Sequence, residues 1–148
     1  VEDVMPEGCT FTPGKATLLR NGADVTLMAC GVMVAPALEA AEILDAEGIS
    51  ARVVNMSSIK PIDVSAIHEA VKMTGAIVSC EEHNMIGGLG AAIAEVLVQS
   101  APAPMEMVGT EDTFGESGTP DALLEKYGLT AAHIVLASKR VISRKSRV

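Results

Sequence analysis

Short apolar runs alternate along this chain with longer segments in which apolar residues recur every three or four positions. The short runs have the length and composition of buried strands, and the periodic segments have the spacing of helices. The predicted strands cover residues 16–20, 25–30, 51–56, 76–80 and 105–108. The predicted helices cover residues 34–47, 64–73, 89–99, 120–127 and 131–141. Because strand and helix alternate after residue 24, the pattern predicts a mostly parallel sheet with helices on both faces, a three-layer α/β/α fold.

Turn and capping residues lie where this pattern changes. Asn21-Gly22 is a strong turn signal, so the two strands that flank it should run antiparallel or nearly so. Gly48 and Gly75 stand where helix C-terminal caps belong. Asp63 is a good N-cap for the helix that follows it. These residues predict the ends of the elements independently of the apolar pattern.

Composition narrows the class of protein. The chain has 148 residues, of which 49% are hydrophobic and only 2% are aromatic, so we expect one domain with an aliphatic core. The formal net charge of -8 argues against a nucleic-acid partner. No apolar run approaches the ~20 residues that span a membrane, and no basic-then-apolar leader opens the chain. We therefore expect a cytoplasmic protein without membrane contact.

The cysteines and the two ends of the chain suggest no chemistry of their own. Cys9, Cys30 and Cys80 are odd in number and widely spaced, which is typical neither of a disulfide framework nor of a zinc site. Residues 1–14 are rich in Pro and Gly and are interpreted as the end of a linker in a fragment of a longer protein. The last ten residues hold five Lys or Arg, and we expect residues 143–148 to form a solvated basic tail. The domain itself is then expected to cover residues 15–142.

Titratable and glycine residues follow the apolar run 76–80 directly. In open α/β sheets, ligands bind at the carboxyl ends of the strands. The polar residues are Glu81, Glu82 and His83, and the glycines are Gly87, Gly88 and Gly90. The polar group is either an acid/base site or an edge that hydrogen-bonds nearby backbone, and at most two of its three side chains can face one ligand. The glycines either hold an anion at the helix start or let the helix pack close to the sheet.

The common nucleotide and nucleophile motifs are missing from the sequence. The turn after residues 25–30 holds only one glycine, Gly31, where a dinucleotide-binding fingerprint needs G-x-G-x-x-G. No Gly-Lys-Ser/Thr P-loop and no G-x-S-x-G elbow occurs. These absences argue against nucleotide binding and against a nucleophile triad, and no partner ligands for a metal ion are evident.

Four segments, taken together and in order, resemble the C-terminal domain of transketolase-like, thiamine-diphosphate-dependent enzymes. They carry a strand ending in Gly31, a Lys60-Pro61-Ile62-Asp63 turn, an EEH…GGLG segment, and a D-x-F-G-x-S-G…LL-x-x-Y-G-L segment, at residues 24–31, 53–63, 81–90 and 112–129. The resemblance covers about residues 14–137. It is nearest to the short or split transketolases, and related domains occur in deoxyxylulose-phosphate synthase and in the beta subunits of 2-oxoacid dehydrogenases.

The resemblance implies a five-stranded sheet of order 1-3-2-4-5 with the first strand antiparallel. The switch point would lie between the strands ending at Cys30 and Cys80, and Gly31 and residues 81–90 would line one crevice there. Ligand or interface contacts are then expected from Gly31, Lys60, Glu81, Glu82, His83, Gly87, Gly88 and Gly90.

The resemblance also implies what this chain lacks. In the family, a Gly-Asp-Gly…Asn motif in a preceding domain holds the diphosphate of the cofactor and magnesium, and the activating glutamate belongs to the middle domain. Neither is present here, so the resemblance implies no catalytic residue and no metal ligand in this chain. The implied role of the fragment, inactive by itself, is to pack against the thiamine-binding domains of the same enzyme and to support a homodimer that transfers two-carbon ketol units between sugar phosphates.

Two other readings of the sequence stay open. One is a free-standing regulatory module that binds a small molecule or an anion at the switch point of the sheet. The other is a purely structural assembly domain. Within the family, the same domain of deoxyxylulose-phosphate synthase or of a 2-oxoacid dehydrogenase beta subunit is the alternative to transketolase.

Overall fold

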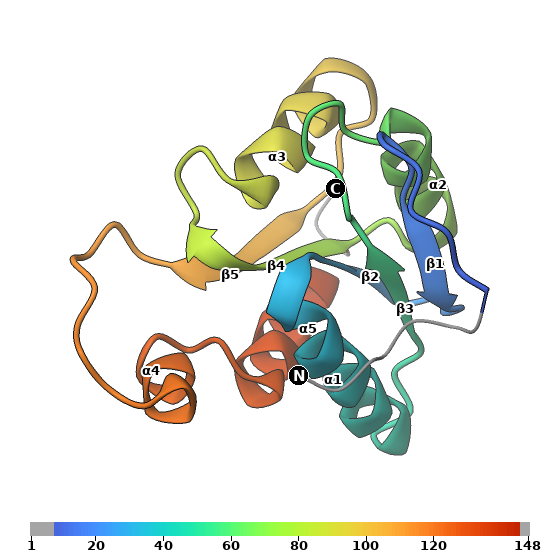
Figure 1. Ribbon diagram of the computed structural model, residues 1–148. Coiled ribbons are helices and arrows are strands. Elements are labelled where there is room, and N and C mark those ends of the chain that lie inside the picture. The colour runs from blue at the N-terminus through green and yellow to red at the C-terminus, as the bar shows by residue number, and fades with distance from the viewer. Residues whose placement is uncertain (1–7, 146–148) are drawn as a thin grey trace.

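Five strands and five α-helices build the chain in a computed structural model that describes residues 8–145 (Figure 1). The strands are β1 (Thr17–Arg20), β2 (Val25–Ala29), β3 (Ala51–Asn55), β4 (Ile77–Asn84) and β5 (Met105–Thr110). The helices are α1 (Val34–Ala46), α2 (Val64–Thr74), α3 (Leu89–Ser100), α4 (Pro120–Lys126) and α5 (Ala131–Lys145), with a short 3-10 turn η1 (Gly31–Met33) before α1. Of the predicted linker 1–14, residues 1–7 lie outside the described residues, and residues 8–14 form neither helix nor strand.

The sheet confirms the expected fold. Its strand order is β1-β3-β2-β4-β5. β1 pairs antiparallel with β3, and all other neighbouring pairs are parallel. Helices α2 and α3 cover one face of the sheet, and α1 and α5 cover the other (Figure 1). The structure is therefore a three-layer α/β/α fold with one antiparallel edge strand.

The central strands bury both faces, and successive residues face opposite layers. Leu27 and Val53 belong to the core that α1 and α5 cover. Met28 and Val54, one residue further along each strand, belong to the core under α2 and α3. Since side chains alternate across a strand, a continuous apolar run is what a strand between two helical layers requires.

The Asn21-Gly22 turn reverses the chain as expected, but β1 and β2 are not partners. β3 lies between them, and β1 pairs with β3. The turn crosses the first residues of β3 at close range: a Cβ added to Gly22 would lie 2.2 Å from the carbonyl carbon of Ala51. Gly22 is therefore needed for close approach of two backbones rather than for a two-residue hairpin.

Two elements, β4 and α5, end four residues later than the sequence pattern predicts. β4 continues through Glu81, Glu82 and His83 to Asn84, because Asn84 pairs with Thr110 of β5 after a register shift that follows Cys80. Helix α5 continues to Lys145, so the expected domain boundary at residue 142 falls inside a helix.

The first three residues of the expected basic tail are consequently helical. Arg144 Nη1 donates to the carbonyl oxygen of Met105 (2.8 Å) and to Oε1 of Glu106 (2.6 Å), and Lys145 Nζ donates to the carbonyl oxygen of Asp24 (3.0 Å). Residues 143–145 are thus part of the packed fold and not a solvated tail, and residues 146–148 lie outside the described residues. No helix within residues 8–145 is long and apolar enough to cross a membrane.

Candidate functional site

The carboxyl ends of β2 and β4 lie side by side in the middle of the sheet. Ala29 is in register with Cys80, and Cys30 N–H donates to the carbonyl oxygen of Cys80 (3.1 Å). After β2 the chain turns into η1 and α1 on one face, and after β4 it turns into α3 on the other (Figure 1). Gly31 allows the first of these turns, since its φ of 57° is strained for other residues. The structure therefore has its switch point where the resemblance implies it.

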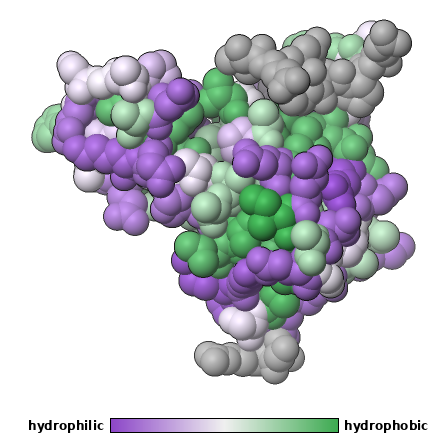
Figure 2. All heavy atoms as spheres, turned by 90° about the horizontal axis from the view of Figure 1, so that it is seen from below, coloured by the Kyte–Doolittle hydropathy of each residue, from purple (hydrophilic) through white to green (hydrophobic). Residues whose placement is uncertain are grey.

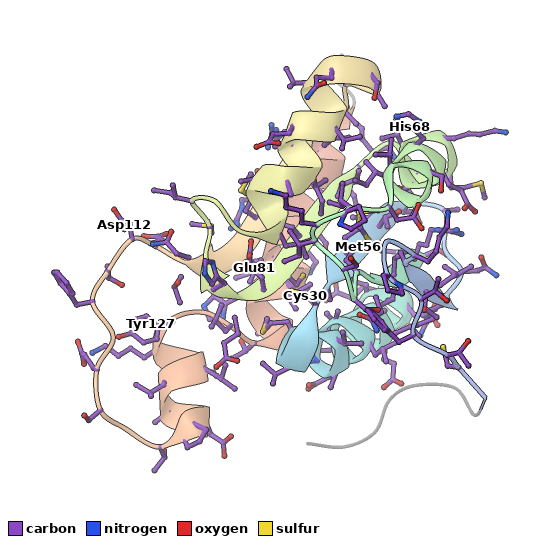
Figure 3. All side chains as sticks on the ribbon, turned by 45° about the horizontal axis from the view of Figure 1, so that its top comes forward. Cys30, Met56, His68, Glu81, Asp112 and Tyr127 are labelled. Atoms are coloured by element: carbon purple, nitrogen blue, oxygen red, sulfur yellow. The ribbon has the colours of Figure 1, made fainter. Side chains whose placement is uncertain are left out.

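Glu81 is buried at this point, with only 1% of its surface exposed. Its two carboxylate oxygens accept hydrogen bonds from the backbone N–H groups of Leu89 (2.7 Å) and Gly90 (2.8 Å), the first residues of α3. Figure 3 shows Glu81 between the end of β4 and the start of that helix. The first N–H groups of a helix lack partners within the helix, and a negative charge there is stabilised by the helix dipole. Glu81 thus caps α3 from the neighbouring strand.

Two of the predicted glycines make this cap possible. A Cβ added to Gly88 would lie 2.0 Å from Oε2 of Glu81. A Cβ added to Gly90 would lie 2.8 Å from Oγ of Ser79 and 2.9 Å from Sδ of Met107. Gly87 differs from both, because its φ of 82° requires glycine while the space around it is open. Gly88 and Gly90 therefore let α3 start directly against the sheet, and the N–H groups that an external anion would need already bind Glu81.

Glu82 and His83 remain on the surface of the molecule. Glu82 lines a pocket of about 330 Å³ together with residues from the β5–α4 loop and α4. Nδ1 of His83 lies 2.9 Å from the carbonyl oxygen of Asn84. The side chain of Asn84 in turn donates to Oδ1 of Asp112 (3.0 Å), which joins the β4–α3 loop to the β5–α4 loop. These side chains lie at the surface of the domain, whereas that of Glu81 is buried.

Lys60 lies apart from this group. It is exposed in the loop after β3, and β2 separates β3 from β4 in the sheet. That loop is held instead by Asp63, whose carboxylate accepts from the N–H groups of Ala16 (2.9 Å) and Ala66 (3.1 Å). The structure therefore does not bring Lys60 and Glu81 together in one crevice.

The two cysteines near the switch point are poor nucleophiles. Burial, together with the nearby Glu81 charge, raises the pKa of Cys30 to about 11. Burial, with the charges of Cys30 and Glu81, raises the pKa of Cys80 further still. Since the thiolate is the reactive form, both groups stay protonated and unreactive near neutral pH. Among residues 8–145, no three His, Cys, Asp or Glu side chains form a group that could hold a metal ion.

The pocket beside Glu82 was not anticipated from the sequence. Its lining is completed by Thr110, Gly115, Glu116, Gly118, Pro120, Leu123, Leu124, Tyr127 and Leu129. All of these residues except Thr110 belong to the segment 112–129, which the sequence marks as a family motif without a stated role. The sequence feature that could have indicated this site is Phe114. It is a large apolar residue in a glycine-containing loop, where no core position is expected.

Comparison with known proteins identifies the family of this domain. A family model described as transketolase, C-terminal domain, matches residues 14–134. A solved structure described as a split gene transketolase, an inactive beta4 tetramer, is similar over 98% of this chain and 48% of its own, with 53% identity and a TM-score of 0.94.

Curated relatives agree with this comparison. The chain is 50% identical to a 6-deoxy-6-sulfo-D-fructose transketolase subunit of Clostridium sp. (strain MSTE9), over 95% of this chain and 44% of that protein. It is 40% identical to a 1-deoxy-D-xylulose-5-phosphate synthase of Heliobacterium modesticaldum, over 93% of this chain and 22% of that protein. The chain thus spans less than half the length of each of these relatives.

Proposed function

Because the chain belongs to the transketolase C-terminal domain family, we propose that it is the C-terminal part of a transketolase-like enzyme that transfers two-carbon ketol units between sugar phosphates. In that enzyme it packs against the preceding thiamine-binding domains and supports a homodimer, and it is inactive by itself. A cytoplasmic location belongs to the same proposal. Support comes from relatives described as transketolase subunits, whose lengths are more than twice the matched region.

The described residues, 8–145, do not fit thiamine diphosphate, which supports a cofactor site outside this domain. The diphosphate needs several free N–H donors or a magnesium site, and the glycine-rich start of α3 is the place in the described chain that resembles one. There, Glu81 already accepts from Leu89 and Gly90 at 2.7 and 2.8 Å. A second anion at this helix start would face a buried carboxylate without a counter-charge. We therefore assign the cofactor and Mg²⁺ to domains outside this chain.

The main support for a structural role is the capping of α3 by Glu81. Glu81 belongs to the Glu-Glu-His group, the motif that most resembled an acid/base site in the sequence. In the fold its carboxylate instead joins the end of β4 to the start of α3. The contact-forming assignments that remain, Gly31, Lys60, Glu82, His83 and Gly87, are proposed as interface residues rather than as reacting groups. Glu81, Gly88 and Gly90 support that surface from within.

Titration of thiamine diphosphate and Mg²⁺ into two proteins tests this proposal by calorimetry. We expect no binding heat with the 148-residue chain and saturable binding with the full-length chain combined with any partner subunit that it requires, since the cofactor contacts belong to other domains or subunits. Mg²⁺ alone, titrated into both, is the control for binding of the metal without the cofactor. Tight binding of the cofactor by the 148-residue chain would contradict the assignment.

The alternatives are separated by two simple observations. A regulatory anion-binding module requires that inorganic phosphate raise the melting temperature of the 148-residue chain in a dose-dependent way. The occupied start of α3 argues against that result. The reaction within the family is decided by domains outside this chain, because deoxyxylulose-phosphate synthases are also relatives at 40% identity. Substrate assays of the full-length chain distinguish that enzyme and a 2-oxoacid dehydrogenase beta subunit from a transketolase.

A further inference from the structure

Two large apolar side chains stand exposed on neighbouring loops at the carboxyl edge of the sheet. Ile86, in the β4–α3 loop, is 73% exposed, and Phe114, in the β5–α4 loop, is 98% exposed. The two loops are fastened together, because Asn84 Nδ2 donates to Oδ1 of Asp112 (3.0 Å) and Met85 N–H donates to the carbonyl oxygen of Thr110 (3.1 Å). The exposed side chains are therefore held on one surface rather than on two independent loops.

The pocket of about 330 Å³ opens on the same surface. Its walls are largely apolar and include Leu123, Leu124 and Tyr127. The hydroxyl of Tyr127 lies 3.4 Å from the carbonyl oxygen of Phe114, which places the pocket next to the backbone of the loop that carries the exposed ring. Figure 3 shows Tyr127 directed from the end of α4 toward this loop, with Asp112 at its other end. We call Ile86, Phe114 and this pocket the edge patch.

The edge patch projects from the body of the domain. In Figure 1 the β5–α4 loop and α4 stand away from the sheet, and Figure 2 shows them as a separate lobe with a mostly hydrophilic surface. No residue of α4 is fully buried. A loop that holds an almost completely exposed Phe has not buried that ring within its own domain, and exposed apolar patches of this kind mark interaction surfaces.

The position of the first described residues indicates what covers the edge patch. Residues 9–12 and 15–17 line a second pocket together with Asn55 and Ser57, at the carboxyl end of β3. The chain therefore reaches β1 from the same edge of the sheet that carries the edge patch. Neighbouring strands lie about 4.8 Å apart, so five strands span roughly 20 Å, less than the ~30 Å diameter of a small domain.

The relatives are long enough to contain a domain that precedes this one. The matched model describes a C-terminal domain, and more than half of the transketolase subunit and of the solved split transketolase lies outside the matched region. A domain joined to this chain near residue 8 would begin at the correct edge and would be broad enough to reach β5.

We propose that the edge patch is the docking surface for the domain that immediately precedes this one in the full-length chain, with Phe114 as its buried anchor. Carboxylates surround the patch at Glu82, Glu111 and Asp112, so the surface of the docked domain carries basic residues opposite them. The proposal rests on the proposed function only in taking this chain to be the C-terminal part of a longer one. Aromatic residues at the centre of an interface contribute most of its binding energy, and Phe114 has the necessary exposure and position.

Hydrogen exchange and limited proteolysis of the full-length chain test the docking. In the wild-type protein, we expect the amides of residues 111–118 to exchange slowly although the loop is exposed in this domain. In Phe114→Asp, we expect their exchange, and cleavage within residues 8–14, to accelerate by at least about tenfold, because a charge replaces the anchor.

Val98→Asp is the matched control. Val98 is 77% exposed near the C-terminal end of α3, at the opposite edge of the sheet, and we expect no acceleration from it. The milder variant Phe114→Ser repeats the test without adding a charge, and raised salt should accelerate exchange in the wild-type protein. Unprotected amides at 111–118 in the wild-type full-length chain, or equal effects of the Phe114 and Val98 variants, would overturn the proposal.

Dilution distinguishes the preceding domain from a second copy or another subunit as the molecule that covers the edge patch. If a second copy or another subunit covers the edge patch, protection of residues 111–118 is lost as the protein is diluted, and docking of the preceding domain is refuted. Protection that survives dilution supports the proposal. If the full-length chain, combined with any partner subunit that it requires, fails to bind thiamine diphosphate, the proposed function fails while protection at Phe114 still reports on docking.

Discussion

At the scale of single residues, Glu81 shows how a buried charge is stabilised without a cation. Its carboxylate has two backbone N–H partners at 2.7 and 2.8 Å and lies at the positive end of a helix. The sequence left two interpretations of the Glu-Glu-His group, an acid/base site and a polar edge bound to backbone. The second is correct for Glu81. Strand alternation predicts that Glu81 and Glu82 point to different sides, but only the packing of α3 decides which of them is buried.

Replacing Glu81 by Gln should lower the free energy of unfolding by about 1–3 kcal/mol. The amide keeps one acceptor oxygen but directs an NH₂ group at a helix N–H group, and the charge at the helix start is lost. Urea unfolding of the 148-residue chain measures the effect. Glu82→Gln, one position along and exposed, is the control and should change stability by less than about 0.5 kcal/mol. Equal effects of the two substitutions would contradict the capping role.

At the scale of elements, Asp63 connects α2 to the start of β1. The sequence predicts its capping of α2, and the hydrogen bond from Ala66 N–H (3.1 Å) confirms this. Its second bond, from Ala16 N–H (2.9 Å), joins residues 47 positions apart and has no sequence signal. Local capping is predictable because it depends on adjacent residues, whereas this second bond depends on where the β3–α2 loop is packed.

The stability provided by Asp63 should depend on pH in one direction. Although partial burial raises its pKa, hydrogen bonds from Ser65, Ala16 and Ala66 and the charge of Lys15 together lower the pKa below the ordinary value. A lowered pKa in the folded state means that the carboxylate contributes stability above the unfolded pKa of about 3.9, and this is lost as pH falls through the folded pKa.

Unfolding free energies of wild type and Asp63→Asn, measured from pH 7 down to about 3, check this expectation. The difference between the two proteins should be largest near neutral pH and should shrink as the pH falls. Glu42→Gln, at an exposed site on α1, should show no such trend. A difference for Asp63→Asn that stays constant over the whole range would refute the ionised cap.

At the scale of the whole molecule, the end of α5 closes the structure. Lys145 contacts the backbone of Asp24, 121 residues away, and Arg144 contacts both Met105 and Glu106 on the edge strand β5. A run of basic residues at a chain end predicts a solvated tail. The acidic side chain of Glu106 and the carbonyl oxygens of Asp24 and Met105 stabilise a continued helix instead.

Arg144→Gln should destabilise the protein by about 0.5–1 kcal/mol, a modest amount because the ion pair is partly exposed. It should also accelerate amide exchange in the last turn of α5, since two contacts to β5 are lost together. Hydrogen exchange with mass spectrometry resolves that turn. Lys126→Gln, which removes the exposed Lys126–Glu116 ion pair on α4, should leave α5 unchanged. A tail that already exchanges freely in the wild-type protein would be inconsistent with the docked helix.

The fold could be predicted from the sequence more fully than the candidate site. The alternation of strands and helices follows from apolar spacing, and the strand order was implied by the family resemblance and is confirmed. The extension of β4 to Asn84 was missed, because polar residues end a strand in a sequence pattern, whereas in the fold Asn84 still pairs with Thr110 of β5. The edge patch was also missed. Its residues come from two loops that meet only in the folded chain.

The sequence by itself determined which segments become strands and helices, where several of them are capped, and which family the domain belongs to. These properties depend on neighbouring residues and on motifs in order, so they can be read without a fold. Only the tertiary structure decided that β4 extends to Asn84, that Glu81 turns inward onto α3, and that the loop of Phe114 lies beside a pocket at the sheet edge. Each of these depends on contacts between residues far apart in the chain, which form only when the layers pack.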